Sequence, residues 1–363
     1  MQILKDIVFY PITVHLIIRI EKVYKVKIRY DELEALSHIV DVMTPPFSLA
    51  RISGNLGIPR IRVSRIIRRI QQKWWIMTAL DIRRICLRKI IVLLRAPPKK
   101  NVSRKAIFTG KTIEDKFIVV FFMPGIRDPY EFIDKMDGVV SYYIFDKMFY
   151  NKPLFRKHFI NGYLRVDLKS ILSNVINNIN LGDIESVITG YDSFYPRSTG
   201  CIPLSLVDRK IIEKLVHNGL LSNRALAKAL NTAQSKINKR IRFLVKTGVL
   251  QGFTVGYSRI TDMGEQLFWI IFIIKFSNLK EALYFVKELI YTPFIGHIDY
   301  DSGSNIVKLV LRVYKENIGY VYDIAKIIGE KLNVIDTMIV NTRTASFHLS
   351  NILGNNVFHI RVA

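Results

Sequence analysis

The chain has 363 residues, half of them hydrophobic, and 54 Lys and Arg against 30 Asp and Glu give it a formal net charge of +24. The apolar content excludes a disordered tail, and the length favours two to four domains over one. The cationic excess indicates a polyanionic partner, with nucleic acid favoured over an anionic membrane.

The first twenty residues are apolar but are interrupted by Lys5, Pro11, His15 and Arg19. A membrane-spanning helix needs about 20 predominantly apolar residues, so we interpret this segment as neither a span nor a secretory signal. We expect a strand or helix packed on the first domain of a soluble, cytoplasmic protein that has no membrane partner.

A helix-turn-helix pattern follows in residues 31–76. A first helix is expected at Asp31–Val42, and Ser48 is suited to cap a second. Pro59 fits the first turn of a third helix. The buried stripe of that helix has helical spacing and consists of Val63, Ile67 and Ile70.

The same skeleton reappears 174 residues later without a gap. Ser222 takes the place of Ser48, and we expect Thr232 to cap the longer helix. Gly248 lies where a helix end favours positive φ, and Val249–Val255 alternates like a wing strand. Three helices and a wing predict a winged helix-turn-helix in each half.

Residues 81–115 have no counterpart in the second half. They carry ten Lys and Arg, with no acidic residue from Ile82 to Ile113 and a plausible strand at Ile90–Leu94. We interpret them as an enlarged basic wing.

Each half continues into an α/β pattern. In the second half the expected order is strand 265–276, helix 279–290, strands 294–299 and 305–314, helix 318–332 and strand 334–349. That βαββαβ order predicts a ferredoxin-like sandwich. The first half shows a similar succession of strands and helices less clearly. Its strands are expected at 116–123, 139–145, 159–166 and 184–188, and its helices at 128–136 and 168–177.

The predicted fold class is therefore α+β, with tandem winged helix-turn-helix domains that are each followed by a ferredoxin-like domain. The expected boundaries are 1–80 for the N-terminal segment and first winged helix, 81–115 for the wing extension, 116–191 for the first ferredoxin-like domain, 192–204 for a linker, 205–260 for the second winged helix and 261–363 for the second ferredoxin-like domain.

The third helix of each winged unit carries the candidate DNA-binding residues. No acid occurs from Met43 to Leu80 or from Lys214 to Thr261, whereas a solvated helix face normally mixes signs. Cations suit phosphates, and Arg, Gln and Asn suit base edges. The candidates are Arg60, Arg62, Ser64, Arg65, Arg68, Arg69, Thr232, Gln234, Ser235, Lys236, Asn238, Lys239, Arg240 and Arg242.

Residues 206–351 resemble the Lrp/AsnC family of archaeal and bacterial regulators. The likeness rests on VDRKIIEKLVHNGLLSNRALAKALN, on SKINKRIRFLVKTGVLQGFTVGYS and on the final stretch DTMIVNTRTASFHLSN. It implies binding of double-stranded DNA by the winged helix, and an α/β domain that senses an amino-acid-like effector and forms oligomers. Because two family-like units are fused here, either an intrachain pseudo-dimer or a homodimer is expected.

Asp299 and Asp301 lie in the segment GHIDYDSG, where the resemblance places the effector pocket. Either they bind the ammonium group of an effector, or they belong to a polar hairpin.

The sequence contains little that indicates an enzyme. The histidines are scattered, no Gly-rich phosphate loop or GxSxG motif occurs, and Cys86 and Cys201 lie far apart. We expect no catalytic residue, metal or cofactor, and no disulfide, which suits a reducing cytoplasm.

Three functions remain open. The first is a transcription regulator, and the second is an architectural DNA-binding protein, because the net charge alone gives nonspecific affinity. The third is a siroheme-decarboxylase-like enzyme, since those enzymes resemble the regulator family and combine two unlike halves. Residues Pro45–Phe47 (PPF) favour the third function, but the second half has no aromatic- and proline-rich turn.

Overall fold

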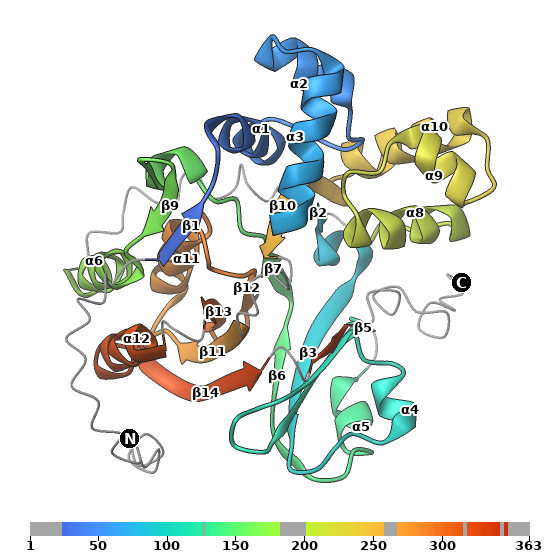
Figure 1. The fold of residues 1–363 in the computed structure, drawn as a ribbon. Coiled ribbons are helices and arrows are strands. Elements are labelled where there is room, and N and C mark those ends of the chain that lie inside the picture. Colours follow the sequence, from blue (N-terminus) through green and yellow to red (C-terminus); the bar gives the residue numbers. More distant parts are fainter. Residues whose placement is uncertain are drawn as a thin grey trace.

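The computed structural model describes residues 24–125, 128–181, 201–257, 267–314, 318–341 and 345–347. The N-terminal segment, the strand expected at 184–188 and most of the predicted linker lie outside these residues. Two winged helices lie at one end of the molecule, and two five-stranded β-sheets with their covering helices, together with one small sheet, form the rest of the described chain (Figure 1).

The first winged helix comprises α1 (Tyr30–Asp41), α2 (Leu49–Leu56), α3 (Arg60–Lys73) and β2 (Trp74–Leu80). Ser48 caps α2 as predicted, since its hydroxyl accepts a hydrogen bond from the Arg51 amide at 3.4 Å. Gly57 ends α2 with φ at +64°, a conformation that glycine adopts without steric cost. The predicted stripe of α3 is buried against α1 and α2.

The second winged helix comprises α8 (Leu206–His217), α9 (Asn223–Ala229), α10 (Gln234–Lys246) and β10 (Leu250–Tyr257). Ser222 caps α9, and Gly248 has the predicted positive φ. The predicted cap of α10 is wrong. Ala233 occupies the N-cap position, and the Thr232 hydroxyl donates instead to the Leu230 carbonyl at 3.0 Å.

The two wing strands pair with each other. β2 and β10 form an antiparallel ribbon in which Trp74 lies opposite Tyr257 and Leu80 opposite Leu250. Gly219, before α9, donates its amide to the Ile76 carbonyl at 2.9 Å, and an added Cβ there would lie 2.8 Å from the backbone of β2. The ribbon therefore joins the two winged helices into one unit.

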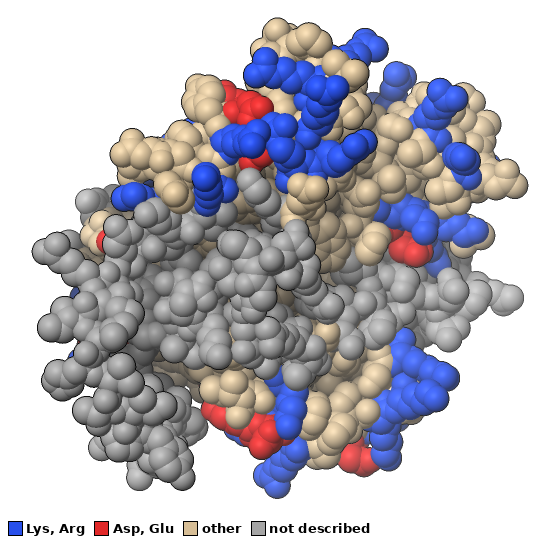
Figure 2. Space-filling model, in the orientation of Figure 1, with Lys and Arg blue, Asp and Glu red and all other residues tan. Residues whose placement is uncertain are grey.

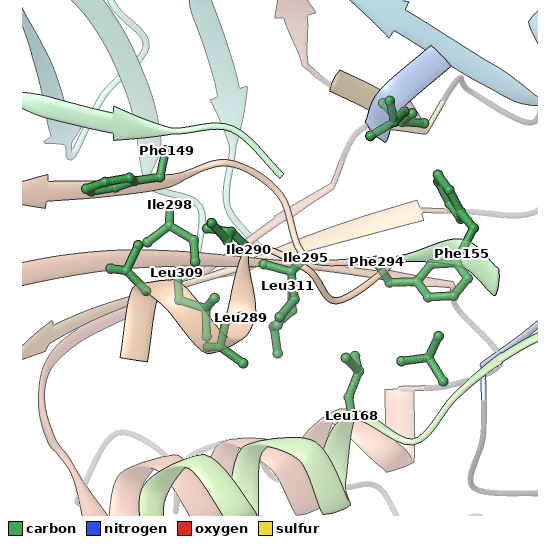
Figure 3. Packing of buried hydrophobic residues seen from close by; sticks show 14 of the residues in the cluster. Phe149, Phe155, Leu168, Leu289, Ile290, Phe294, Ile295, Ile298, Leu309 and Leu311 are labelled. Carbon is green, nitrogen blue, oxygen red and sulfur yellow. The ribbon is translucent and has the colours of Figure 1, made fainter. Parts of the chain in front are cut away.

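The second ferredoxin-like domain matches the expected order. It consists of β11 (Leu267–Lys275), α11 (Leu279–Leu289), β12 (Ile298–Asp301), β13 (Ile306–Tyr314), α12 (Ile318–Lys331) and β14 (Asn333–Asn341). The strand order β14-β11-β13-β12 is that of a ferredoxin-like sheet. Side chains of α11, β12 and β13 pack into one hydrophobic cluster on this sheet (Figure 3).

The first half differs from the expected boundaries. Its sheet is built from β3 (Leu87–Leu94), β4 (Phe108–Lys111), β5 (Phe117–Pro124) and β6 (Val139–Phe145) in the order β4-β5-β3-β6, with α4 (Lys100–Ser103) and α5 (Pro129–Ile133) as its helices. The basic segment expected to be a wing thus supplies β3 and β4. The reason is that β3, central between β5 and β6, buries its apolar run on both faces.

The strand expected at 159–166 also lies elsewhere. It is split into β8 (Phe159–Ile160) and β9 (Tyr163–Val166), which form a small sheet with β1 (Tyr24–Lys27). The helix predicted after it, α6 (Leu168–Leu181), packs against α11 and α12 of the second half. Two 3₁₀ helices, η1 (Ile82–Ile85) and η2 (Phe155–His158), complete the described elements of the first half, apart from β7.

The two large sheets pack on each other and exchange edge strands. β7 (Lys147–Phe149), which follows β6, pairs with β12 of the second sheet, so that Phe149 lies opposite Ile298 (Figure 3). β15 (Ser346–Phe347), from the end of the second half, pairs with β4 of the first. Phe108 stacks on Trp269 across the interface with ring centroids 5.1 Å apart.

The expectation of unpaired cysteines is wrong. Cys86 and Cys201 form a disulfide across 115 residues of sequence, with their Cα atoms 5.4 Å apart. The Ile202 amide donates to the Arg84 carbonyl at 2.7 Å, which holds the segment before α8 against η1. The fold thus brings the cysteines together, and they give no support to a reducing compartment. Among the described helices, none is long and apolar enough to cross a membrane.

Candidate nucleic-acid interface

Most of the predicted DNA-binding side chains lie on the exposed faces of α3 and α10. Both helices bury a stripe of β-branched and Leu residues, which turns their polar positions outward. Lys and Arg side chains gather over this end of the molecule (Figure 2). The exposed candidates are Arg60, Arg62, Arg65, Arg68, Gln234, Ser235, Lys236, Lys239 and Arg242, while Ser64, Arg69, Thr232, Asn238 and Arg240 are half-buried.

Arg69 is tied to the first helix of its own unit. Its Nη2 lies 2.7 Å from Asp31 Oδ2, and its Nε lies 2.8 Å from Glu32 Oε1. The Glu32 carboxylate is 1% exposed, and its hydrogen bond is the main cause of the raised pKa of Arg69. This guanidinium therefore fixes α3 against α1.

Arg240 has the same relationship to α8 in the second unit. Its Nε lies 2.6 Å from Oδ1 of the buried Asp208, and the second carboxylate oxygen accepts from both Arg240 and Ser205. These hydrogen bonds outweigh burial and lower the pKa of Asp208. The sequence placed both arginines among the DNA-binding candidates without distinguishing them from their exposed neighbours.

The amide of Asn238 also has an intramolecular partner, because its oxygen accepts from Asn223 at the start of α9. The side chains of Arg60, Arg62, Arg65 and Arg68 form no ion pair within the part of the chain that the structure describes. The same holds for Lys236, Lys239 and Arg242 of α10 within those ranges. Each third helix therefore presents cations that no acid of the described chain neutralises.

The ribbon fixes how the two helices are related. Trp75 of β2 donates its indole N–H to the carbonyl of His217 at the end of α8. On the other side, α1 of the first unit packs against β10 of the second. Each wing strand thus contacts the helices of the opposite unit, and the ribbon is shared.

Asp299 and Asp301 occupy very different environments. Asp299 is fully buried, and its Oδ2 accepts from Lys89 at 2.7 Å and from Lys308. Asp301, at the end of β12, accepts from the Gly303 amide at 3.1 Å and from the Ser304 hydroxyl. Asp299 does bind ammonium groups, but they belong to lysines of the chain itself.

Sequence reasoning missed Lys89, Lys308 and His297, which surround Asp299. His297 Nε2 lies 2.5 Å from the Lys89 ammonium and 3.0 Å from that of Lys308. The sequence did contain an indication of this cluster, because Lys308 interrupts the apolar strand IVKLVLRV. In the structure its position faces the opposite sheet. Over the described ranges, no group of three or more metal-ligating side chains is close enough to hold an ion.

The comparisons with known proteins centre on the second winged unit. The model of the winged helix-turn-helix DNA-binding family matches residues 204–251. Residues 204–251 form a winged helix-turn-helix domain. The fold around it has the winged helix and βαββαβ sheet of the Lrp/AsnC-like regulators that the sequence resembles.

Two archaeal regulators are similar to the chain in this region. An HTH-type transcriptional regulator of Pyrococcus furiosus is 49% identical over 49 residues, 14% of this chain and 33% of that protein. A second, from Pyrococcus abyssi, is 40% identical over 68 residues, 17% of this chain and 46% of that protein. The chain thus spans between a third and a half of the length of these relatives.

Two solved structures resemble the backbone at low sequence identity. The siroheme decarboxylase NirDL is 11% identical and covers 86% of this chain and 91% of its own, with a TM-score of 0.47. LrpC of Bacillus subtilis is 19% identical and covers 38% of this chain and 95% of its own, with a TM-score of 0.30. At these TM-scores, the likeness supports no functional inference.

Proposed function

We propose that the protein is a transcription regulator that binds double-stranded DNA in the cytoplasm through both of its winged helices. The observation that carries the proposal is the pair of acid-free faces on α3 and α10, each with exposed cations that have no ion-pair partner in the described ranges. Neutralising duplex phosphates with such cations releases counterions and drives association. The domain match at residues 204–251 supports the second helix directly.

The proposed contact residues divide by chemistry. On α3, Arg60, Arg62, Arg65 and Arg68 bind phosphates and guanines, because a guanidinium forms paired hydrogen bonds to both. On α10, Lys236, Lys239 and Arg242 bind phosphates. We assign base-edge contacts on that helix first to the exposed Gln234, whose amide suits adenine. Asn238 would contribute after exchanging its hydrogen bond with Asn223 for one to a base. Three polar neighbours contribute less to DNA binding, namely Ser64, Thr232 and Ser235. Arg69 and Arg240 instead hold the two helices in place.

We also infer that the two halves act as a pseudo-dimer within one chain. The shared β2–β10 ribbon and the exchanged strands β7 and β15 support this arrangement. Two identical recognition helices read a palindrome, whereas two unlike ones require unlike half-sites. Asp299 and Asp301 are both engaged within the chain, so the proposal gives them no role in binding an effector amine.

The salt dependence of DNA binding tests the proposal. Each neutralised phosphate contributes about 0.9 to the slope of log affinity against log salt, and docking of both helices should involve about six to ten phosphates. A slope shallower than about −3 would mean that the two helices do not both dock. Equal affinity for every duplex would favour an architectural binder. A visible tetrapyrrole band in the purified protein would favour the decarboxylase-like alternative.

A further inference from the structure

One large aliphatic side chain lies among the exposed cations of α3. Ile61 is 67% exposed, although isoleucine is among the residue types most often buried in folded proteins. It belongs to the first turn of the helix, between Arg60 and Arg62, which are also exposed. Single exposed apolar residues are common on protein surfaces, so the position of Ile61 on the helix is what matters.

Ile61 lies on the side of α3 that faces away from the core. Residues three and four apart share a helix face, so Ile61, Arg65 and Arg68 form one stripe. Both arginines are exposed. The buried Ile70 follows Ile61 by about 2.5 turns at about 3.6 residues per turn, which places it on the opposite side of the helix. The isoleucine is therefore in line with two arginines to which the proposed function assigns DNA contacts.

The corresponding stripe of α10 begins with a different side chain. In the alignment of the two winged units, Ser235 takes the place of Ile61, while Lys239 and Arg242 take the places of the two arginines. All three residues of α10 are exposed. Both stripes thus carry cations at their second and third positions. They differ in chemistry at the first position, which is aliphatic in α3 and a hydroxyl in α10.

The first position is the one best placed to meet a base. The N-terminal residues of a recognition helix contact base edges in the major groove. Thymine presents its C5 methyl group there, whereas guanine, adenine and cytosine present hydrogen-bonding groups. Covering the exposed Ile61 with a methyl group removes apolar surface of both partners from water, which favours binding.

We propose that Ile61 packs against the C5 methyl group of a thymine and makes the half-site bound by α3 depend on that base. Ser235 gives the half-site bound by α10 no such dependence. The inference rests on the proposed function, because it requires α3 to dock in the major groove. It adds a base identity to the phosphate and guanine contacts of the α3 arginines, and it supplies one chemical reason for two unlike half-sites.

Replacement of thymine by uracil tests the inference, because it removes only the C5 methyl group from the duplex. The full chain is titrated with the duplex recovered by footprinting, and with duplexes in which each thymine in turn is replaced by uracil. We expect one replacement to weaken binding about fourfold, the effect of losing one buried methyl or methylene group. Ile61→Ser, which copies the side chain of α10, should bind the two duplexes equally.

Ile113→Ser is the matched control, because it makes the same change at an exposed position between β4 and β5, outside both winged helices. This variant should keep the difference between thymine and uracil. Loss of the difference in Ile61→Ser alone supports the inference.

Three results would overturn the inference while the proposed function stands, because the unmodified duplex is still bound. They are a site without thymine, equal affinity of the wild-type chain for every uracil-containing duplex, and a methyl dependence that Ile61→Ser retains. A wild-type chain that binds no duplex would overturn both the inference and the proposed function.

Discussion

The ammonium of Lys89, on the first half's central strand, lies 2.7 Å from Oδ2 of Asp299, on the second half's β12. This contact links the two sheets through the apolar interface. Asp299→Asn would leave two buried ammonium groups without their carboxylate, so we expect a loss of about 3–5 kcal/mol in the free energy of unfolding. Denaturant titration of the variant and the wild type measures this loss.

Asp301→Asn is the matched control for that change, because the same substitution two residues away keeps an oxygen for the Gly303 amide, while the Ser304 hydroxyl can rotate to accept from the new amide. It should alter stability by about 1 kcal/mol or less, because Asp301 is half-buried and its hydrogen bonds are local to the turn. If the two variants are equally stable, the ionic contact does not help to hold the halves together.

Titration of Lys308 should make the free energy of unfolding depend on pH. Burial lowers its pKa to about 7 in the folded chain, whereas an unfolded lysine titrates near about 10.4. Between these values the unfolded state binds more protons, so the free energy of unfolding should increase as the pH rises from about 7 to about 10. Lys308→Met should lose this increase relative to wild type. Parallel curves for the two proteins would show that Lys308 titrates normally.

Substitutions of two neighbouring arginines of α10 should affect different properties, one the stability of the protein and the other its affinity for DNA. Arg240→Ala leaves the buried Asp208 unpaired and should cost about 3–5 kcal/mol of stability. Arg242→Ala removes an exposed side chain and should weaken DNA binding while changing the unfolding midpoint little. Thermal unfolding and a DNA-binding titration on the same two variants distinguish the roles. A destabilised Arg242→Ala with unchanged DNA affinity would reverse the assignment.

The disulfide should stabilise the connection into the second winged helix. A bridge that closes a loop of this length restricts the unfolded chain and typically adds about 2–4 kcal/mol. The Cys86→Ser, Cys201→Ser double variant should lose that amount in denaturant unfolding. Thiol titration of the unfolded, unreduced wild-type chain should detect no free thiol. Two free thiols would contradict the bridge.

The sequence predicted most features that rest on local periodicity and capping, except the cap of α10, where Ala233 takes the place expected for Thr232. Ser48 and Ser222 cap their helices, and the stripe of α3 is buried as expected. These features depend on residues within a few positions of one another. The same reasoning identified the exposed basic faces that form the candidate interface.

The sequence did not predict contacts between segments that lie far apart in the chain. Ile90–Leu94 was recognised as a strand, but its central place between β5 and β6 depends on pairing with distant segments. Likewise, no local pattern pairs Cys86 with Cys201, or shows that Arg240 binds Asp208 while Arg242 faces solvent. Such contacts follow from the tertiary fold.

The central claim is that one chain presents two unlike recognition helices, joined by the β2–β10 ribbon, to a single duplex. Footprinting on a selected genomic fragment, combined with light scattering, tests it most directly. We predict a monomer that protects an asymmetric site, with two unlike half-sites separated by about 10 bp or a multiple. A stable dimer that protects a perfect palindrome, or the absence of any protected site, would contradict the account.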